Sequence, residues 1–384
     1  MDIPRTLLVT DDYPPRVGGI QRTLHSLMRE LPPDRVAVLA PSWPGSEAFD
    51  AAEPYEIHRS ASYMWPTPDT RRLLQEVVHR TKAEVALFGD ALPLGMFGPM
   101  LAKQGVPYLV AAHGFDYWLS LVPGAASVLR RATSRASRVV VMCSAFIARV
   151  VRTAVPDRVP VSVMYPGADI ERFHPDLPTA EVRARHGISE DDPLVVCVSR
   201  LVRRKGQDVL IRGLPTIRRR VPDARLLVVG GGPYRGDLER MASEAEPGTI
   251  VFSGEVSDDE LPNYYAAGDV FAMPCRTRLG GFEVEGWGNV FLEAAACARP
   301  VVAGNSGGAP EAVDDGVTGL VVDGAHPGAV AEAVGSLLVD PVRARAMGKA
   351  GRARVERSYT WPHATAKLAF WLREAAEGRQ ARRN

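Results

Sequence analysis

The chain has 384 residues, of which 46% are apolar and 24% charged, a composition typical of a folded globular protein that excludes a disordered or fibrous chain. This length exceeds what one compact core usually holds, so we expect two domains. The 46 basic and 45 acidic residues leave a net charge of +1, so there is no overall field to attract nucleic acid.

The cysteines and the hydropathy pattern indicate the compartment. None of the four cysteines has metal-ligand spacing from another, which favours reduced thiols in a reducing cytosol. No uncharged apolar stretch approaches the roughly 20 residues of a membrane span. We therefore expect a cytoplasmic protein, and any contact with the inner face of the cell membrane is expected to be peripheral.

In the first half of the chain, strands alternate with helices. Strands are expected at residues 6–10, 36–40, 84–88, 108–112 and 138–142, and helices at 20–31, 70–82, 92–104, 121–136 and 144–154. Such alternation predicts a parallel sheet covered by helices on both faces. Residues 155–176 are rich in proline and short polar residues, which predicts a linker between domains.

A second alternating series follows this linker. Its strands are expected at 194–199, 225–229, 250–252, 270–273 and 300–303, and its helices at 207–220, 235–245, 259–267, 288–297, from 310, and from about 328 to 377. The predicted fold class is α/β, with two doubly wound Rossmann-like domains facing a central cleft. We place the N-terminal domain at 1–168 and the C-terminal domain at 169–384.

Paired or triple glycines occur in four loops that connect a strand to a helix: Gly18-Gly19, Gly230-Gly231-Gly232, Gly280-Gly281 and Gly307-Gly308. Glycine lets backbone N–H groups approach a phosphate, and a helix N-terminus favours negative charge. Together the loops predict a phosphate- or nucleotide-binding cleft. None of them matches a P-loop or the full dinucleotide fingerprint, which argues against a simple ATPase or a dehydrogenase.

Charged residues are placed where they could contact such a ligand. Arg200 and Lys205 follow a strand, and two cations there can neutralise a diphosphate as it leaves; a solvated basic loop is the alternative. Glu285 and Glu293 lie around a helix start, and their carboxylates can accept hydrogen bonds from sugar and ribose hydroxyls. The alternative is a helix-dipole acid with an ordinary surface glutamate. His113 ends a strand beside a glycine, which directs it into the cleft.

Several motifs are absent from the sequence. It has no Asp-x-Asp triplet, so a metal-bound diphosphate is not supported and no metal ligands are predicted. It also lacks Gly-x-Ser-x-Gly and His-Glu-x-x-His, which argues against common hydrolases and zinc proteases.

Residues 128–152 form a basic segment without an acidic residue. Its arginines are Arg130, Arg131, Arg135, Arg138, Arg149 and Arg152, with Leu121, Val122, Leu129 and Phe146 nearby. The segment could lie on an anionic membrane surface. A solvated helix face is an equal alternative, because arginine is abundant throughout this chain. Sparse aromatic residues disfavour a nucleic-acid patch.

Together, these motifs resemble the retaining glycosyltransferases of family 4, which have the GT-B fold. The resemblance covers essentially the whole chain and also includes Pro166-Gly167-Ala168-Asp169 and Pro310-Glu311. Within the family, residues 199–208, 270–278, 284–286 and 303–311 look most similar to GDP-mannose-dependent phosphatidylinositol mannosyltransferases. One departure is His113-Gly114-Phe115-Asp116, where that group has His-Gly-His-Glu, so the acceptor is less well supported than the donor.

The resemblance implies a front-face displacement that retains the anomeric configuration and uses no protein nucleophile. Arg200 and Lys205 would hold the diphosphate, Glu285 the sugar hydroxyls and Glu293 the ribose. Gly19 would donate its N–H to the diphosphate, and His113 would contact the transferred sugar. The implied catalytic residues are His113, Arg200, Lys205 and Glu285, and the implied donor-binding residues are Gly18, Gly19, Arg200, Lys205, Gly231, Val256, Glu285 and Glu293.

The expected function is transfer of a hexose, mannose from GDP-mannose, to a phosphatidylinositol mannoside glycolipid without a metal cofactor. One alternative is a transferase that uses another UDP- or GDP-linked sugar on a natural product or a soluble glycan. The other is a non-catalytic nucleotide-sugar binding protein, against which the four charged residues argue. The final helix, about 360–377, is expected to pack back on the N-terminal domain.

Overall fold

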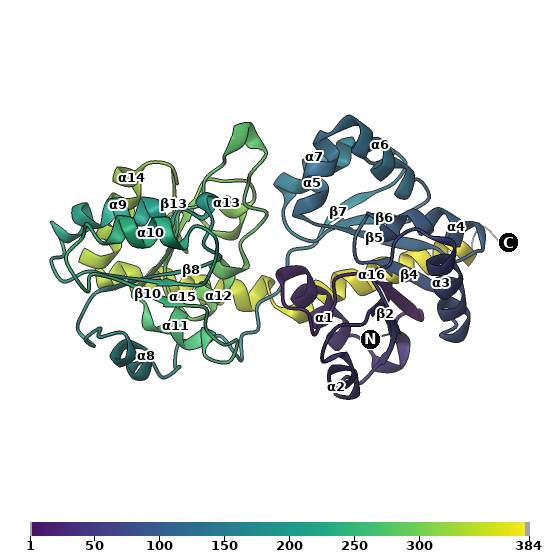
Figure 1. Ribbon diagram of the computed structural model, residues 1–384, viewed down its shortest axis with the longest axis horizontal. Helices are drawn as coiled ribbons and strands as arrows, with labels where there is room; N and C mark the ends of the chain where they lie inside the picture. Colours follow the sequence, from purple (N-terminus) through teal and green to yellow (C-terminus); the bar gives the residue numbers. More distant parts are fainter. Residues whose placement is uncertain (1, 381–384) are drawn as a thin grey trace. The chain divides into compact units, whose positions relative to one another are not determined.

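The computed structural model describes residues 2–380 of the chain, with side chains to residue 378 (Figure 1). It divides into two compact units. The first contains residues up to 167 together with the segment from 361 onward, and the second contains residues 168–360. None of the helices within the described residues combines the length and the apolarity needed to cross a membrane.

The first unit contains a seven-stranded parallel sheet with the order β3-β2-β1-β4-β5-β6-β7. The strands are β1 (Thr6–Val9), β2 (Val36–Pro41), β3 (Glu56–Ser60), β4 (Val85–Phe88), β5 (Tyr108–Ala112), β6 (Arg138–Val141) and β7 (Val161–Val163). The inner strands β1, β2, β4 and β5 are completely buried, as expected for apolar runs covered on both faces. The edge strands β3 and β7 escaped sequence-based prediction because neither is a buried apolar run.

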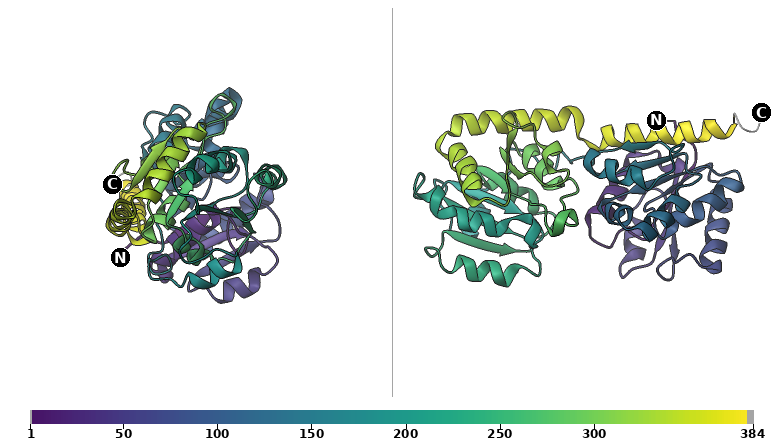
Figure 2. Two further views of the ribbon diagram at one scale, coloured as in Figure 1. Left: turned by 90° about the vertical axis from the view of Figure 1, so that its left-hand side faces the viewer. Right: turned by 90° about the horizontal axis from the view of Figure 1, so that it is seen from above.

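Helices cover both faces of this sheet. They are α1 (Gly19–Glu30), α2 (Ser46–Ala51), α3 (Pro68–Arg80), α4 (Gly98–Lys103), α5 (Gly114–Leu121), α6 (Pro123–Ala132), α7 (Ala145–Thr153) and α16 (Trp361–Gln380), with 3₁₀ turns η1 (Pro33–Arg35) and η2 (Leu94–Phe97). Helix α16 runs along one side of the unit (Figure 2), and Leu368 and Leu372 on it are completely buried in a core shared with α1.

The helix predicted over 121–136 corresponds to α6, which is shorter than expected, and the preceding helix α5 was not predicted. Two helices, α5 and α6, meet at Val122, which has an extended conformation. Proline at position 123 disfavours helical geometry in the residue before it, so one helix ends and the next begins with the proline in its first turn.

The second unit contains a six-stranded parallel sheet with the order β10-β9-β8-β11-β12-β13. The strands are β8 (Leu194–Val198), β9 (Arg225–Val229), β10 (Ile250–Gly254), β11 (Val270–Met273), β12 (Val301–Gly304) and β13 (Gly319–Val322). The covering elements are α8 (Ala180–Arg185), η3 (Arg203–Lys205), α9 (Gln207–Arg218), α10 (Arg235–Ala242), α11 (Leu261–Ala267), η4 (Leu279–Gly281), α12 (Asn289–Ala296), α13 (Ala309–Ala312), α14 (Pro327–Val339) and α15 (Pro341–Ser358).

The strand order predicts where each unit binds a ligand. In both sheets the first strand of the unit lies in the interior of the sheet. β1 lies between β2 and β4, and β8 lies between β9 and β11, so the strand order reverses its direction at β1 and at β8. Ligands of such sheets bind outside the carboxyl ends of the strands, at this switch point. The loops that follow β1 and β4, and those that follow β8 and β11, are therefore the candidate ligand-binding loops.

Candidate functional site

The loops after β8 and β11 bring Lys205 and Glu285 together. The ammonium Nζ lies 2.7 Å from Glu285 Oε2, and the two side chains are only 11% and 7% exposed. Burial raises the pKa of the Glu285 carboxyl, but the charges of Lys205 and Arg204 outweigh this effect and the pKa lies below its ordinary value. Glu285 is therefore ionised at neutral pH, and the switch point holds a fixed carboxylate beside a fixed ammonium.

Arg200 complements this pair from the end of β8. Its side chain is exposed, and no group in the described part of the chain forms a hydrogen bond or an ion pair with its guanidinium. Its backbone is nevertheless held, because the buried Gln207 donates from Nε2 to the carbonyl of Arg200 at 3.1 Å. The guanidinium of Arg200 is thus available to bind an anion, and the backbone that carries it is fixed.

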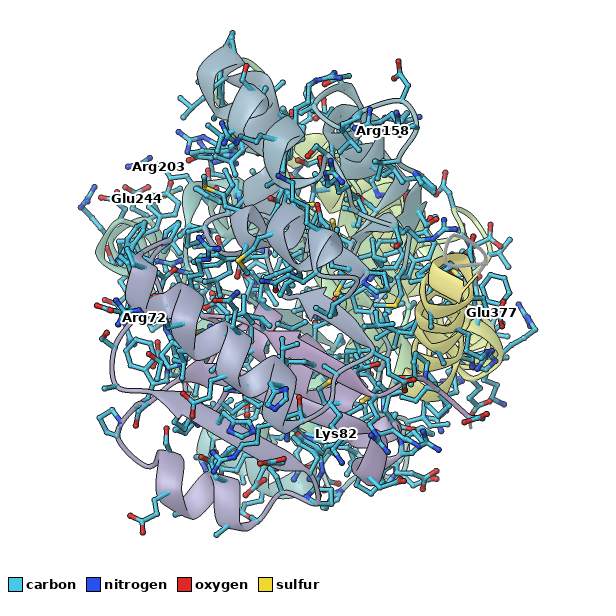
Figure 3. The ribbon with its side chains drawn as sticks, turned by 90° about the vertical axis from the view of Figure 1, so that its right-hand side faces the viewer. Arg72, Lys82, Arg158, Arg203, Glu244 and Glu377 are labelled. Atoms are coloured by element: carbon cyan, nitrogen blue, oxygen red, sulfur yellow. The ribbon has the colours of Figure 1, made fainter. Side chains whose placement is uncertain are left out.

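The residues between these two cations play different parts. Arg203 forms an ion pair with Asp237 at 2.8 Å and lies over the ring of Tyr234 at 4.3 Å. Its side chain extends outward from the surface (Figure 3). Arg204 instead lies 3.8 Å from Glu285. The solvated-loop interpretation therefore fits the exposed side chain of Arg203 but not that of Arg204, which is partly buried.

The loop after β12 supports Glu285 from the other side. Its Gly307 has a φ of +55°, and a Cβ there would lie 2.1 Å from the carbonyl oxygen of Glu285, so only glycine fits. The N–H of Gly308 donates to that carbonyl at 2.9 Å, and the N–H of Glu285 donates to the Ser306 hydroxyl at 3.2 Å. This glycine pair therefore has a role in loop packing, which sequence reasoning did not separate from phosphate binding.

Glu293 lies in helix α12 and is not a surface residue. It is 8% exposed, and Tyr265 donates its hydroxyl hydrogen to Glu293 Oε2 at 2.5 Å. The interpretation of an ordinary surface glutamate is therefore wrong. The hydrogen bond from Tyr265 holds its carboxylate in a defined orientation.

Gly231 and Val256 follow neighbouring strands of the same sheet. Gly231 lies in the loop after β9 and Val256 two residues after β10, and the N–H of Gly230 donates to the carbonyl of Gly254 at 2.8 Å. Both residues are partly exposed. They extend the carboxyl edge of the sheet beyond β8, on the side opposite to β11.

In the first unit, Gly18 and Gly19 end the loop after β1. Gly18 is the N-cap of α1 and Gly19 its first residue. The first N–H groups of a helix have no partner within the helix, and the helix dipole makes that end positive. Gly19 is exposed, and a side chain there would meet no atom within 4 Å. The pair thus leaves open the approach to backbone donors.

His113 caps α5 at the end of β5. It is buried, and its Nε2 lies 2.8 Å from the carbonyl oxygen of Gly89, so Nε2 carries the hydrogen, because a carbonyl can only accept. Burial lowers the pKa of the imidazole, which is therefore neutral near pH 7. His113 connects the ends of β4 and β5 at the same edge as the glycine pair.

Three carboxyl groups at this edge were missed by the sequence reasoning. Burial raises the pKa of Asp11 to about 6 and that of Asp116 to about 7, and it raises the pKa of Asp90 well above its usual value. Asp11 and Asp90 each follow the last residue of a strand, β1 or β4, by two positions. That position at a switch point was the signal that could have identified them.

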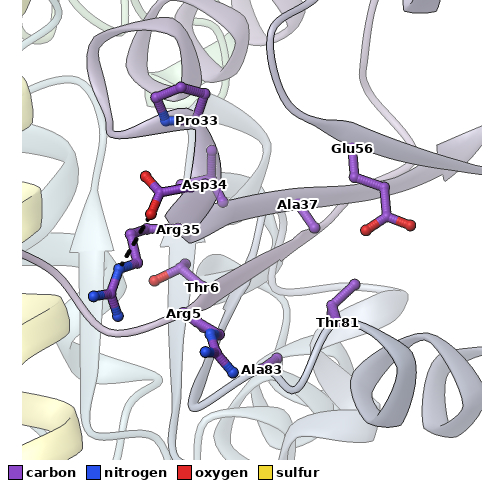
Figure 4. Close-up of a pocket in the computed structure, with 10 residues that line it drawn as sticks. Arg5, Thr6, Pro33, Asp34, Arg35, Ala37, Glu56, Thr81 and Ala83 are labelled. Carbon is purple, nitrogen blue, oxygen red and sulfur yellow. Dashed lines mark ion pairs between the residues drawn. The ribbon is translucent and has the colours of Figure 1, made fainter.

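The hollow shown in Figure 4 lies at the opposite, amino edge of the first sheet. Arg5 and Thr6 at the start of β1, with Glu56 at the start of β3, line it. Arg35 there already pairs with Asp34 at 3.6 Å. The mixed charges and the location away from the strands' carboxyl ends do not fit a diphosphate site. Among the described residues, no group of three or more His, Cys, Asp or Glu side chains is arranged to hold a metal ion.

Comparison with known families assigns both halves of the chain. Residues 17–172 match the model described as Glycosyltransferase Family 4, and residues 178–354 match that of Glycosyl transferases group 1. The chain is 45% identical, over 98% of its length and 100% of the relative's, to GDP-mannose-dependent alpha-(1-6)-phosphatidylinositol monomannoside mannosyltransferase of Mycolicibacterium smegmatis. It is 38% identical, over 93% of its length and 94% of the relative's, to the monoacylated-substrate counterpart from Corynebacterium glutamicum.

Solved structures show the same fold at low sequence identity. HepE from Anabaena, in complex with UDP and glucose, has a TM-score of 0.79 and 19% identity, with 96% of this chain and 99% of that chain covered. Sucrose-phosphate synthase from Thermosynechococcus elongatus has a TM-score of 0.76 and 21% identity, with 97% and 100% covered. These likenesses, together with the family matches, assign the GT-B fold that the sequence motifs predicted.

Proposed function

Because the chain belongs to the family 4 glycosyltransferases, we propose that it transfers mannose from GDP-mannose to a phosphatidylinositol mannoside. The observation that carries the proposal is the buried Lys205–Glu285 pair at the switch point, together with Arg200 in the loop after β8, whose guanidinium has no partner among the described residues. The proposal is also supported by sequence similarity to mycobacterial and corynebacterial enzymes whose names state this donor and this acceptor class. The second unit would bind the donor, and the first the acceptor.

Arg200 and Lys205 would hold the donor diphosphate. An ammonium has three hydrogens, so Lys205 can donate one hydrogen bond to Glu285 and another to a phosphate oxygen. Arg200 supplies a second cation without first breaking an ion pair. Both contacts strengthen as negative charge builds on the departing diphosphate, which lowers the barrier to its departure.

Glu285 would accept hydrogen bonds from the hydroxyls of the transferred sugar. In the reaction, the acceptor hydroxyl oxygen attacks the anomeric carbon from the face that the diphosphate leaves. The bond between that carbon and the phosphate oxygen breaks, and this oxygen takes the acceptor's proton. The protein then supplies no nucleophile and no dedicated base, and the negative carboxylate of Glu285 stabilises positive charge on the sugar ring.

Further ligand contacts are proposed within each unit. Glu293 would accept from the ribose hydroxyls with the oxygen orientation that Tyr265 imposes. Gly231 and Val256 would line the nucleotide side of the same edge. Within the first unit, Gly18 and Gly19 would offer backbone N–H groups to a phosphate, and His113, as a neutral imidazole, would contact a sugar.

A lipid acceptor requires contact with a membrane, and helices α5 and α6 offer a surface for it. Phe115 and Trp118 on α5 are 63% and 44% exposed, and Arg131 in the last turn of α6 is also exposed. The basic segment of 128–152 does not act as one face, however. Leu129 is completely buried, and Arg138 and Arg152 are engaged with Glu374 and Asp157. The proposed docking surface is therefore the α5–α6 surface, defined by Phe115, Trp118, Val122 and Arg131.

The experiment is to incubate the protein with labelled GDP-mannose and with UDP-linked sugars, each with and without phosphatidylinositol monomannoside. We expect label in the lipid phase from GDP-mannose alone and retention of the anomeric configuration. We also expect activity to survive EDTA, because cations and backbone N–H groups are proposed to carry the diphosphate charge. Transfer only to a soluble acceptor, or only from a UDP-sugar, would contradict the proposal.

A further inference from the structure

We infer that Asp208 and Arg276 form a positioning pair that sets Glu285 against Lys205, an inference that rests on the proposed role of those two residues in donor binding. Asp208 lies in the first turn of α9, directly after the loop that carries Arg200 and Lys205. Arg276 lies in the loop after β11, nine residues before Glu285. Neither residue belongs to the donor contacts proposed above.

Asp208 is a buried carboxylate with two cationic partners. Its side chain is 2% exposed, and the Nη2 of Arg276 lies 3.0 Å from its carboxylate oxygens. Arg212, one turn further along α9, is the second partner, and its side chain is 53% exposed. A buried charge must be paired to be tolerated. Arg212 could pair with Asp208 within the helix, so charge compensation alone does not require Arg276. Arg276, which is 16% exposed, is the partner that connects α9 to another loop.

The loop after β11 lies directly against the cation loop at this point. The N–H of Arg276 donates to the carbonyl oxygen of Arg204 at 2.8 Å. Gly206, with a φ of +82°, approaches Pro274 so closely that a Cβ would lie 2.0 Å from the proline carbonyl oxygen. The backbone on each side of Lys205 is therefore in contact with the beginning of the loop that carries Glu285.

A second tether continues from Arg276 toward Glu285. The hydroxyls of Thr277 and Ser306 lie 3.0 Å apart, and the same Ser306 oxygen accepts the N–H of Glu285 at 3.2 Å. Ser306 is completely buried. The loop is thus fixed at its start by Asp208 and at its end by Ser306. Breaking the side-chain pair at the start removes one of the constraints that bring the Glu285 carboxylate within 2.7 Å of Lys205.

The test compares four variants by mannosyl transfer, by calorimetric binding of GDP and by melting temperature. Asp208→Asn and Arg276→Gln each remove the pair that joins the two loops. Arg212→Gln removes only the partner within α9. Glu332→Gln is the control for loss of an exposed ion pair, because Glu332, which is 63% exposed, pairs with Arg220 at 2.9 Å beyond the other end of α9.

We expect Asp208→Asn and Arg276→Gln to lower kcat at least tenfold while KM for the donor changes less than threefold. A looser pair also lets the pKa of Glu285 rise, so the acid limb of the pH profile of kcat/KM should move to higher pH. Arg212→Gln and Glu332→Gln should leave kcat and this limb unchanged. A purely structural role would lower the melting temperature without moving the limb.

Equal effects of Arg212→Gln and Arg276→Gln, or an unmoved acid limb in a folded Asp208→Asn protein, would overturn the inference. If Asp208→Asn fails to fold, the Arg276→Gln result decides. Measuring GDP affinity against pH for the same variants repeats the comparison independently, because this measurement needs neither the sugar nor the acceptor. If the wild type transfers no mannose but the GDP-binding limb still moves, the proposed function fails and the positioning pair stands.

Discussion

At the scale of single residues, the site depends on charges that the fold holds in fixed pairs. Glu285 stays ionised although it is buried, because Lys205 and Arg204 overcome the effect of burial on its pKa. Since its pKa is depressed in the fold, the pair stabilises the protein above the ordinary glutamate pKa. That stabilisation is lost as the pH falls through the depressed value. The donor site should therefore weaken in acid before the fold does.

Removing either diphosphate cation should reduce turnover. Arg200→Ala and Lys205→Ala each lose a charge-assisted contact that strengthens as the diphosphate leaves, which corresponds to roughly 2–4 kcal/mol of transition-state stabilisation. Lys205→Ala also leaves Glu285 without its closest cation, so it should lower the melting temperature, whereas the exposed Arg200 should not. Steady-state kinetics and thermal unfolding of both variants check this. Near-wild-type kcat/KM in both would reject the diphosphate assignment.

The two glutamates should differ in which kinetic parameter they control. Glu285→Gln keeps the shape but removes charge where the sugar ring becomes positive, so kcat should fall more than donor affinity. Glu293→Gln alters ribose contacts that are similar in ground and transition states, so affinity should fall more than kcat. Calorimetry with the donor and single-turnover rates separate the two effects. The reverse pattern would exchange the roles, and no change in either variant would make the motif structural.

At the scale of elements, helix α5 shows how a cap couples charge to stability. The N–H of His113 donates to Asp116 Oδ2 at 2.7 Å where the helix begins. Burial nevertheless raises the pKa of Asp116 to about 7. A raised carboxyl pKa means that the folded state favours the neutral acid. The stability it contributes is complete below the unfolded pKa, near 4, and is lost as the pH rises toward 7.

Asp116→Asn should therefore gain stability relative to the wild type as the pH rises. The asparagine oxygen still accepts the cap hydrogen bond, but it never carries the buried charge. The difference in melting temperature should grow from pH 4 to about pH 7 by on the order of a few °C and then level off. Asp34→Asn, at an exposed site, is the control and should show no such trend. A difference that shrinks with pH would contradict the assigned pKa shift.

At the scale of the whole molecule, the proposed lipid acceptor requires that the protein reach a membrane. The α5–α6 surface combines exposed apolar side chains with an arginine, and α5 begins directly after His113. Apolar side chains at the bilayer boundary and basic ones near anionic headgroups stabilise peripheral binding. The acceptor headgroup would then enter the first unit at the carboxyl edge of its sheet.

Liposome binding tests this surface. Wild-type binding should rise with the anionic lipid content and weaken with salt, and Phe115→Ala with Arg131→Glu should reduce both binding and lipid transfer. Hydrolysis of the donor should remain unchanged in that variant. Phe370→Ala, on α16, removes an equally exposed phenylalanine and should bind as the wild type does. Absent or salt-insensitive binding would favour a soluble acceptor.

The fold class, most of the inner strands and the family could all be predicted from the amino-acid sequence. Apolar runs such as 194–198 and 108–112 are buried on both faces, so their pattern is local and readable. The edge strand β3 has no such run, because its pairing with β2 rather than burial makes it a strand. The boundary between α5 and α6 could also have been predicted, because Pro123 marks it.

The contacts between residues far apart in the chain could not be predicted and depend on the assembled fold. Lys205 and Glu285 are 80 positions apart, and nothing local indicates that they form a buried ion pair. The same holds for Glu293 with Tyr265, and for Asp208 with Arg276. Parallel strands bring their carboxyl ends to one edge whatever their separation along the chain. Charge pairing and burial at that edge therefore depend on strand order, which becomes visible only when the sheet is assembled.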